Sequence, residues 1–245
     1  MKLKKIRSKI IRLIGRITGC YNWGKNNKVI VIKNGKPHER IFMPKGLNVI
    51  FDGSNCTVTI EKPISFQNTF INLEGNNAEV KLAQTSSKIS NVKIYADYDC
   101  KITVGKGVYF SDTNVVLIAN AAYDKPISIE IGENVAIARD VLIRTSDGHT
   151  IINPETKEPL NPSESIKIED NVWIGSKCVI LKGVHISKGS IVGACSLVNK
   201  KFDEENVIIA GTPAKIIKHN VTWHHNGYGF YKKHYFDPMI KDQNC

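Results

Sequence analysis

The clearest pattern in the chain is an aliphatic residue at every sixth position along part of its second half. This ladder comprises Ile168, Ile174, Ile180, Ile186, Val192 and Val198. The fifth place of each hexad is mostly small or β-branched, and three of the six fourth places hold asparagine or glycine, which readily adopt positive φ at a corner. Because side chains alternate along a strand, the first and fifth places both point inward. Neither a helix nor a hairpin has a strict six-residue period, so the pattern predicts an all-β fold, a parallel β-helix with three hexads in each coil.

A shorter piece of the same ladder precedes it at Ile131, Ile137 and Ile143, and then the register breaks. Ile143 and Ile168 are much farther apart than one hexad, and the extra residues fall within 145–165. This segment has three prolines and no apolar periodicity, so it predicts a loop extruded from one corner of the β-helix. Loops of this length in a compact domain are usually functional.

Looser repeats precede the strict hexads. Four alternating segments end at Ile60, Leu82, Val104 and Ile131, so each repeat is somewhat longer than three hexads, and turn residues precede each segment. Two further strand-like pieces, Val29–Ile32 and Arg40–Met43, are expected in the first coil. No linker rich in glycine, proline or serine interrupts the series, so we expect one continuous β-helix over residues 21–219.

Residues 1–20 combine regularly spaced apolar positions with seven basic residues and no acidic residue. The spacing predicts an amphipathic helix, and the segment has neither the apolar stretch of a signal peptide nor that of a membrane span. Such a helix lies on an anionic membrane surface or caps the open end of a β-helix, and the two roles are compatible. At the other end, residues 220–245 form an aromatic tail that we expect to pack on the body or on a neighbouring subunit.

Charge and cysteine content exclude several classes of protein. The net charge is +11, but outside positions 1–20 basic residues only slightly outnumber acidic ones, without a basic stripe interleaved with aromatics. Nucleic-acid binding is therefore not expected, and no glycine-rich nucleotide loop is present. The six cysteines show no C-x-x-C motif and are interpreted as reduced thiols that fill small apolar positions, Cys178 and Cys195 within the hexads. The seven histidines lack the spacing of a metal site, so no metal is expected.

The extruded loop contains a single histidine, His149, which closely follows Asp147. A neutral imidazole is a natural general base for a hydroxyl at neutral pH, and a neighbouring carboxylate can fix its tautomer. The alternative is an ordinary solvated histidine. Trp173 is the second candidate: it precedes an inward isoleucine and therefore faces outward, either as an anchor between subunits or as one wall of a site.

Three motifs carry a resemblance to a known family: Asn171–Gly175 (NVWIG), Ile191–Ser196 (IVGACS) and Ile209–Lys215 (IAGTPAK). Together with the unbroken hexads they resemble the left-handed β-helix acyltransferases with hexapeptide repeats. The Asp-x-His element of the loop, its spacing along the chain from Trp173 and the aromatic tail most resemble bacterial polysaccharide O-acetyltransferases, the capsular polysialic acid O-acetyltransferases above all.

The resemblance implies transfer of acetyl from acetyl-CoA to a sugar hydroxyl, in a homotrimer whose active sites lie between neighbouring subunits. His149 would be the general base and Trp173 would line the site opposite it. The resemblance further implies a set of residues that bind acetyl-CoA: Gly175, Gly193, Ala194, Lys200, Gly211, Pro213 and Lys215. The chain departs from many sugar acetyltransferases in that His149 is followed by Thr150 instead of proline.

The sequence as a whole thus predicts an acetyl-CoA-dependent O-acetyltransferase of a capsular or cell-surface polysaccharide, cytoplasmic and peripheral to the inner face of the membrane. Two alternatives stay open at this point. One is N-acetylation of an amino-sugar nucleotide, and the other is a β-helix scaffold without catalytic activity. The particular sugar and hydroxyl do not follow from the sequence, because acceptor choice depends on the loop, the tail and the neighbouring subunit.

Overall fold

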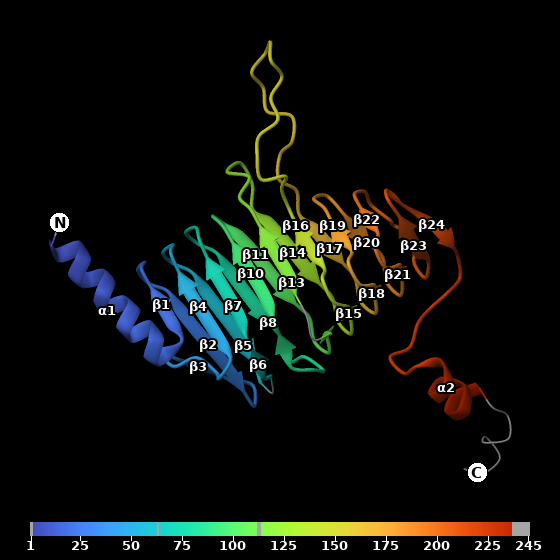
Figure 1. The fold of residues 1–245 in the computed structure, drawn as a ribbon, viewed down its shortest axis with the longest axis horizontal. Helices are drawn as coiled ribbons and strands as arrows, with labels where there is room; N and C mark the ends of the chain where they lie inside the picture. Colours follow the sequence, from blue (N-terminus) through green and yellow to red (C-terminus); the bar gives the residue numbers. More distant parts are fainter. Residues whose placement is uncertain (1, 63, 112–113, 237–245) are drawn as a thin grey trace.

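The computed structural model of the chain describes residues 2–62, 64–111 and 114–236. In this part of the chain the strands wind into a parallel β-helix, with the N-terminal coils at one end and the strict hexads at the other (Figure 1). Helix α1 (Lys2–Thr18) lies at the N-terminal end, and a short helix, α2 (Tyr228–Tyr231), continues into a π-helical turn (Lys232–Phe236) after the last strand. The expected all-β, parallel β-helix architecture with an extruded loop is confirmed.

Three flat sides make up the coils. The first sheet contains β1 (Cys20–Asn22), β4 (Leu47–Phe51), β7 (Thr69–Leu73), β10 (Val92–Ala96), β13 (Val115–Ala119), β16 (Leu142–Arg144), β19 (Val179–Ile180) and β22 (Leu197–Val198). The second contains β3 (Lys36–Glu39), β2 (Lys28–Lys33), β5 (Thr57–Glu61), β8 (Glu79–Leu82), β11 (Cys100–Val104), β14 (Ile127–Ile131), β17 (Ile166–Ile168) and β20 (His185–Ile186). The third contains β12 (Tyr109–Phe110), β15 (Ala136–Ile137), β18 (Trp173–Ile174), β21 (Ile191–Val192), β23 (Ile208–Gly211) and β24 (Ala214–Lys218), and β6 (Phe66–Gln67) pairs with β9 (Ile89–Ser90).

The hexad pattern matches the interior. Every first-place residue of the ladder is at most 1% exposed, and every fifth-place residue at most 4%. Five of the six fourth-place residues have positive φ: Asn171, Lys177, Gly183, Gly189 and Cys195. Lys177 and Cys195 adopt this conformation without the conformational freedom of glycine, because a further hexad follows each of them and the chain must turn at that place.

The looser repeats stack in the register that their spacing predicts. Ile60 pairs with Leu82, Leu82 with Val104, and Val104 with Ile131. Positive-φ asparagine and aspartate residues form a ladder at one corner of these coils; for example, the side-chain amide of Asn77 donates to Asp99 at 2.9 Å. The prediction of a strand at Arg40–Met43 is wrong. This segment is irregular, because β3 ends at Glu39 after pairing with β2 in an antiparallel hairpin and the chain then turns toward α1.

The five described cysteines differ in burial, and Cys20 is half-buried. Cys56, Cys100 and Cys178 are buried among apolar side chains, as expected, and burial raises the pKa of Cys100 to about 12. Cys195 differs from the prediction of a small interior filler, because the fourth place of its hexad is a corner and the residue there is exposed. Among the described cysteines none forms a disulfide.

The two ends of the chain are less buried than the coils. No helix in the described ranges is long and apolar enough to cross a membrane. Trp223 of the tail packs on the body, but Tyr228, Phe230, Tyr231 and Tyr235 are exposed and contact mainly one another and the tail histidines. The tail therefore leaves the body after its first few residues (Figure 1).

An ion-pair cluster ties the last coils together on the outer face of the second sheet. Glu169 Oε1 lies 3.0 Å from both Lys167 Nζ and His185 Nε2, and Asp203 Oδ1 lies 2.6 Å from His185 Nδ1. The hydrogen bond from Lys167, then that from His185, lowers the pKa of Glu169 from 4.5 to about 2. The pairs link β17 and the residue that follows it to β20 and to the turn after β22.

A pH dependence of stability follows from this cluster. The pKa of Glu169 is lower in the folded state than in the unfolded state. Ionised Glu169 therefore contributes fully to the free energy of unfolding above the unfolded-state pKa of about 4.5, and this contribution is lost as the pH falls through about 2. Glu169→Gln is expected to lower the free energy of unfolding at neutral pH by about 1 kcal/mol, since solvent screens the pair. It is also expected to flatten the loss of stability between about pH 5 and about pH 2. Urea titrations across this range, with the exposed Glu205→Gln as control, measure both effects; parallel curves for wild type and Glu169→Gln would contradict them.

Candidate active site

The extruded loop is anchored where the first sheet gives way to the second. β16 ends at Arg144 and β17 begins at Ile166, and the residues between them project from the solenoid (Figure 1). At the base, buried Thr145 accepts a bond from Asn120 N at 2.9 Å and from Glu164 N at 3.0 Å. Farther out, Ile152 and Pro159 form an antiparallel bridge. The loop is therefore hydrogen-bonded at both its base and its middle.

His149 lies on the inner flank of this loop, beside a cavity of about 540 Å³. The opposite wall comes from the preceding coil and includes Asn120 and Tyr123. The side chain of His149 is exposed, and no described residue hydrogen-bonds to its imidazole, while its backbone carbonyl accepts from Asn161 Nδ2 at 2.9 Å. The backbone of His149 is thus held, and its imidazole is without a partner among the described residues beside a space that can admit a hydroxyl.

Asp147 does not orient His149 as the sequence suggested. Its Oδ2 accepts from Lys182 Nζ at 2.6 Å and from Asn161 Nδ2 at 2.8 Å. The hydrogen bonds from Lys182 and Asn161 hold the pKa of this carboxyl below its usual range. Lys182 belongs to the next coil and reaches the corner from which the loop projects. Its ion pair with Asp147 therefore fastens the loop to that coil.

Lys182 lies outside the cavity at His149, and its ion pair with Asp147 predicts that it holds the loop in position. Lys182→Met is expected to lower kcat about 10-fold or more, because the loop that carries His149 loses its tie to the neighbouring coil and misplaces the imidazole. The resemblance implies acetyl-CoA as a substrate, and its KM should stay within about two-fold, since the variant removes none of the residues implied to bind it. Steady-state kinetics measure this split, with Lys101→Met, an exposed lysine paired to Glu79 on earlier coils, as control. An unchanged kcat would show that the loop holds its position without this pair.

Trp173 lies on another side of the coil. It belongs to β18 in the third sheet, faces outward and is 42% exposed. Between it and the loop of His149 the chain turns through the corner that joins the second and third sheets. The cavity at His149 does not include Trp173. One subunit therefore does not bring the two candidate residues to one site.

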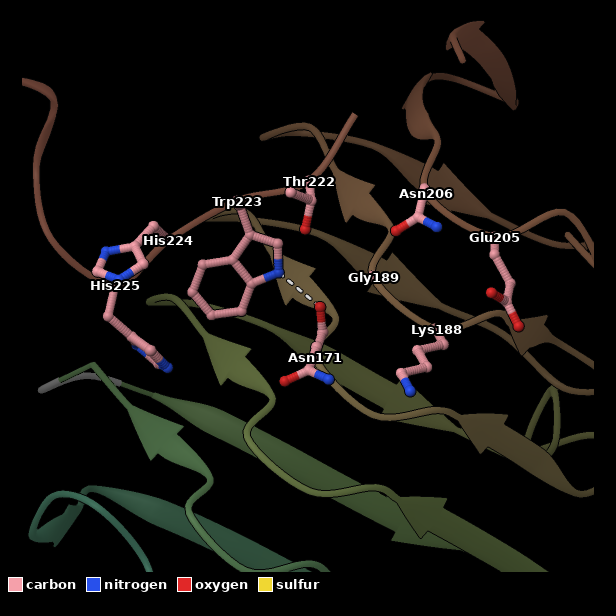
Figure 2. A pocket seen from close by; sticks show the side chains of 9 residues that line it. All are labelled: Asn171, Lys188, Gly189, Glu205, Asn206, Thr222, Trp223, His224 and His225. Carbon is pink, nitrogen blue, oxygen red and sulfur yellow. Dashed lines mark hydrogen bonds between the residues drawn. The ribbon is translucent and has the colours of Figure 1, made fainter. Parts of the chain in front are cut away.

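The tail adds an aromatic residue that the hexad pattern did not identify as part of a site. The rings of Trp223 and Trp173 lie 6.1 Å apart, and Trp223 Nε1 donates to the carbonyl of Asn171 at 2.6 Å. Figure 2 shows Trp223 over a pocket of about 320 Å³, with His225 edge-on to the indole and Lys188 on the far side. The only sequence signal was the high aromatic content of the tail.

Gly175, Gly193 and Ala194 come together at the corner between the third and first sheets. A Cβ on Gly175 would lie 2.7 Å from Ala194 N, and one on Gly193 would lie 2.9 Å from Ala210 Cβ, so the coils are closely spaced here. The N–H groups of both glycines donate within the ladder, to Val192 O and Ile209 O. Of the three, Ala194 alone has an N–H without a hydrogen-bond partner in the described part of the chain. This corner is called the glycine corner below.

The remaining cofactor candidates divide between two places. Gly211, with φ of +107°, extends the glycine corner by one coil, followed by the cis Thr212–Pro213 bond. Lys215 lies across the terminal hairpin, opposite Ala210. Lys200 lies apart from them, after β22 at the corner between the first and second sheets, with its ammonium 5.4 Å from the ring of Phe202. The structure therefore groups six of the seven candidates and separates Lys200.

In the part of the chain that the structure describes, no group of three or more His, Cys, Asp or Glu side chains is arranged to hold a metal ion.

Comparisons with known proteins agree with the fold. Residues 165–200 match the family model described as bacterial transferase hexapeptide (six repeats). The chain is 30% identical over 200 residues to the polysialic acid O-acetyltransferase of Neisseria meningitidis, covering 80% of this chain and 83% of that protein. It is 36% identical over 96 residues to the polysialic acid O-acetyltransferase of Escherichia coli O1:K1 / APEC, covering 39% of this chain and 31% of that protein.

A crystal structure of the polySia-specific acetyltransferase NeuO superposes with a TM-score of 0.72 at 27% identity, covering 92% of this chain and 93% of that one. Across several curated relatives the alignments span 31% to 64% of the relatives' own lengths. The match to the meningococcal protein extends over most of both chains, and the hexads form the expected coils. The chain belongs to the hexapeptide-repeat acetyltransferases of the left-handed β-helix fold.

Proposed function

We propose that the protein transfers acetyl from acetyl-CoA to a hydroxyl of a bacterial capsular or cell-surface polysaccharide. The observation that carries this proposal is the similarity over 83% of the meningococcal polysialic acid O-acetyltransferase. The extruded loop supports it, because it presents an exposed imidazole beside an open cavity. A sugar hydroxyl needs a base at neutral pH, and an imidazole is suited to that task.

In the proposed reaction His149 takes the proton of the acceptor hydroxyl as its oxygen attacks the thioester carbonyl carbon. The resulting oxyanion needs a hydrogen-bond donor, for which a backbone N–H or the indole N–H of Trp173 is suited. Collapse of the tetrahedral intermediate breaks the carbon–sulfur bond. The proton held by His149 then passes to the CoA thiolate, which leaves the acetyl ester and neutral imidazole.

The positions of His149 and Trp173 favour a site shared between subunits. Because the two side chains lie on different sides of one coil, a cavity that contains both requires a second β-helix beside the first. We therefore infer a homotrimer in which His149 of one subunit faces Trp173 of the next. Trp223 extends that wall, since it packs beside Trp173 and offers a further aromatic surface to a sugar ring.

The glycine corner is the proposed binding surface for the pantetheine arm of acetyl-CoA. Its small residues allow close approach to the backbone, and Ala194 has an N–H available to a pantetheine carbonyl. Pro213 and Lys215 lie beyond Gly211 in the terminal hairpin, where the ammonium of Lys215 can pair with a phosphate of the nucleotide. Lys200 is proposed for the same nucleotide end, from the neighbouring corner.

Thiol release from acetyl-CoA, measured against a panel of capsular polysaccharides, tests the proposed function. Polysaccharide-dependent release together with a base-labile acetyl group on the product is expected. A base-stable product formed on an amino-sugar nucleotide would instead indicate N-acetylation. Absence of both acetyl-CoA binding and thiol release would favour a scaffold without catalytic activity.

A further inference from the structure

Helix α1 faces the solenoid with Gly15, Thr18 and the half-buried Ile11, whereas most of its large apolar side chains are exposed. Gly15 and Thr18 are buried, and Gly15 packs so closely on the ring of Tyr21 that a Cβ there would overlap it. Arg7 donates from Nη2 to the carbonyl of Trp23 at 2.9 Å, which fixes the middle of the helix to the first coil. The helix thus lies along the N-terminal end of the solenoid (Figure 1).

The opposite face of α1 is apolar and without a partner in the described part of the chain. Its large side chains are Ile6 (54% exposed), Ile10 (52%), Leu13 (60%), Ile14 (48%) and Ile17 (68%). If the helix served only as a cap, these side chains would pack on the first coil. They are instead the more exposed set, so the apolar stripe is turned away from the body.

A second exposed apolar element lies at the C-terminal end of α1. Met43 N donates to Thr18 O at 2.7 Å, which places the irregular segment at Arg40–Met43 against the C-terminal end of α1. Within it Ile41 is 71% exposed and Phe42 64%. A cavity of about 720 Å³ opens beside these residues, and its charged lining comprises the basic Lys33, Arg40 and Lys62 and the acidic Glu39. Two exposed apolar segments therefore lie next to each other at the N-terminal end of the solenoid.

The charge around this surface is predominantly positive, and Glu39 is the one acidic residue in the lining of the cavity. From the start of the chain to position 38 every charged residue is a lysine or an arginine, and the first acidic residue is Glu39. A second copy of the same face would bring like charges together, which opposes self-association through it. An anionic surface that also accepts apolar side chains would match both the excess of basic residues and the exposed apolar side chains.

We propose that the outward face of α1, together with Ile41 and Phe42, docks the protein on an anionic lipid bilayer. The helix lies in the headgroup plane, its isoleucine and leucine side chains enter the acyl boundary, and the lysine and arginine side chains contact lipid phosphates. The solenoid then stands with its N-terminal end on the membrane and its later coils farther from it. In the proposed trimer three such faces would act together and increase binding by avidity.

Flotation of the full-length protein with phosphatidylcholine vesicles, with and without phosphatidylglycerol, tests this proposal. Wild type is expected to float with the anionic vesicles and not with the neutral ones, and added salt should weaken the binding. The double variant Leu13→Glu/Ile17→Glu is expected to lose binding by about ten-fold or more. Phe42→Glu is expected to weaken it in the same direction and leaves the helix intact. Ile217→Glu is the matched control, because that isoleucine is 64% exposed at the opposite end of the solenoid.

Several outcomes would overturn the proposal. Equal recovery of wild type with and without anionic vesicles would do so. So would vesicle binding that both glutamate variants retain, because the apolar face would then have no part in it. Light scattering that shows a larger assembly, lost in the same variants, would identify a second copy as the occupant. Thiol release measured on the same preparations is independent of the vesicles, so a failure of the proposed function remains distinguishable.

Discussion

His149→Ala is expected to lower kcat for the proposed acetyl transfer to a polysaccharide by about 10²- to 10⁴-fold. The acceptor hydroxyl is protonated at neutral pH, and the variant removes the imidazole beside the loop cavity. The KM for acetyl-CoA should change little, because the glycine corner and the terminal hairpin, which are proposed to bind it, lie on other parts of the coil. Polysaccharide-dependent thiol release measures both parameters. His38→Ala, an exposed histidine on β3, is the matched control.

The same variant also tests the shared site. Subunits with His149→Ala and subunits with Trp173→Ala are each expected to be nearly inactive alone. When they are unfolded together and refolded as a mixture, some interfaces combine an intact His149 with an intact Trp173, and activity should return. Mixtures that stay as inactive as the separate variants would contradict a site between subunits. A His149→Ala enzyme that keeps more than about a tenth of the wild-type kcat would contradict the general base itself.

The fold followed from the sequence because one geometric requirement repeats. Each hexad needs an inward aliphatic residue, a left-handed corner and a small inward residue, so a single period specified which residues are buried from Ile168 to Val198. The same logic located the loop, since the missing register between Ile143 and Ile168 has no other explanation. The looser coils followed too, because turn residues mark the start of each alternating segment.

Contacts between distant segments did not follow from the sequence. The hexad register does not predict which cation reaches Asp147. In the structure Asp147 pairs with Lys182 and not, as the sequence had suggested, with His149. Which face of α1 meets the body also depends on the shape of the first coil, where Tyr21 admits only a glycine. Trp223 lies beside Trp173 because the tail turns back after the last hairpin, and no periodicity predicts that turn.

Ile180→Ala is expected to be the most destabilising single change of this set, with a loss of about 2 to 5 kcal/mol in the free energy of unfolding. Ile180 is fully buried in the first sheet and stacks between Ile143 on one side and Val198 on the other. In a solenoid each coil contacts only its neighbours, so the cavity weakens the packing of this coil on both neighbouring coils. Urea and thermal denaturation measure the loss, which corresponds to a fall in Tm on the order of 10 °C.

Val179→Ala is the matched control, because the adjacent side chain of the same strand is only half-buried and points outward. Its cost should stay below about 1 kcal/mol. A similar cost for both variants would mean that the coils relax into the space left by Ile180. The closeness of Ile180 to Lys182 along the chain adds a functional consequence. Loosening this coil releases the anchor of the loop, so the Ile180→Ala enzyme should lose activity at temperatures below its own unfolding transition.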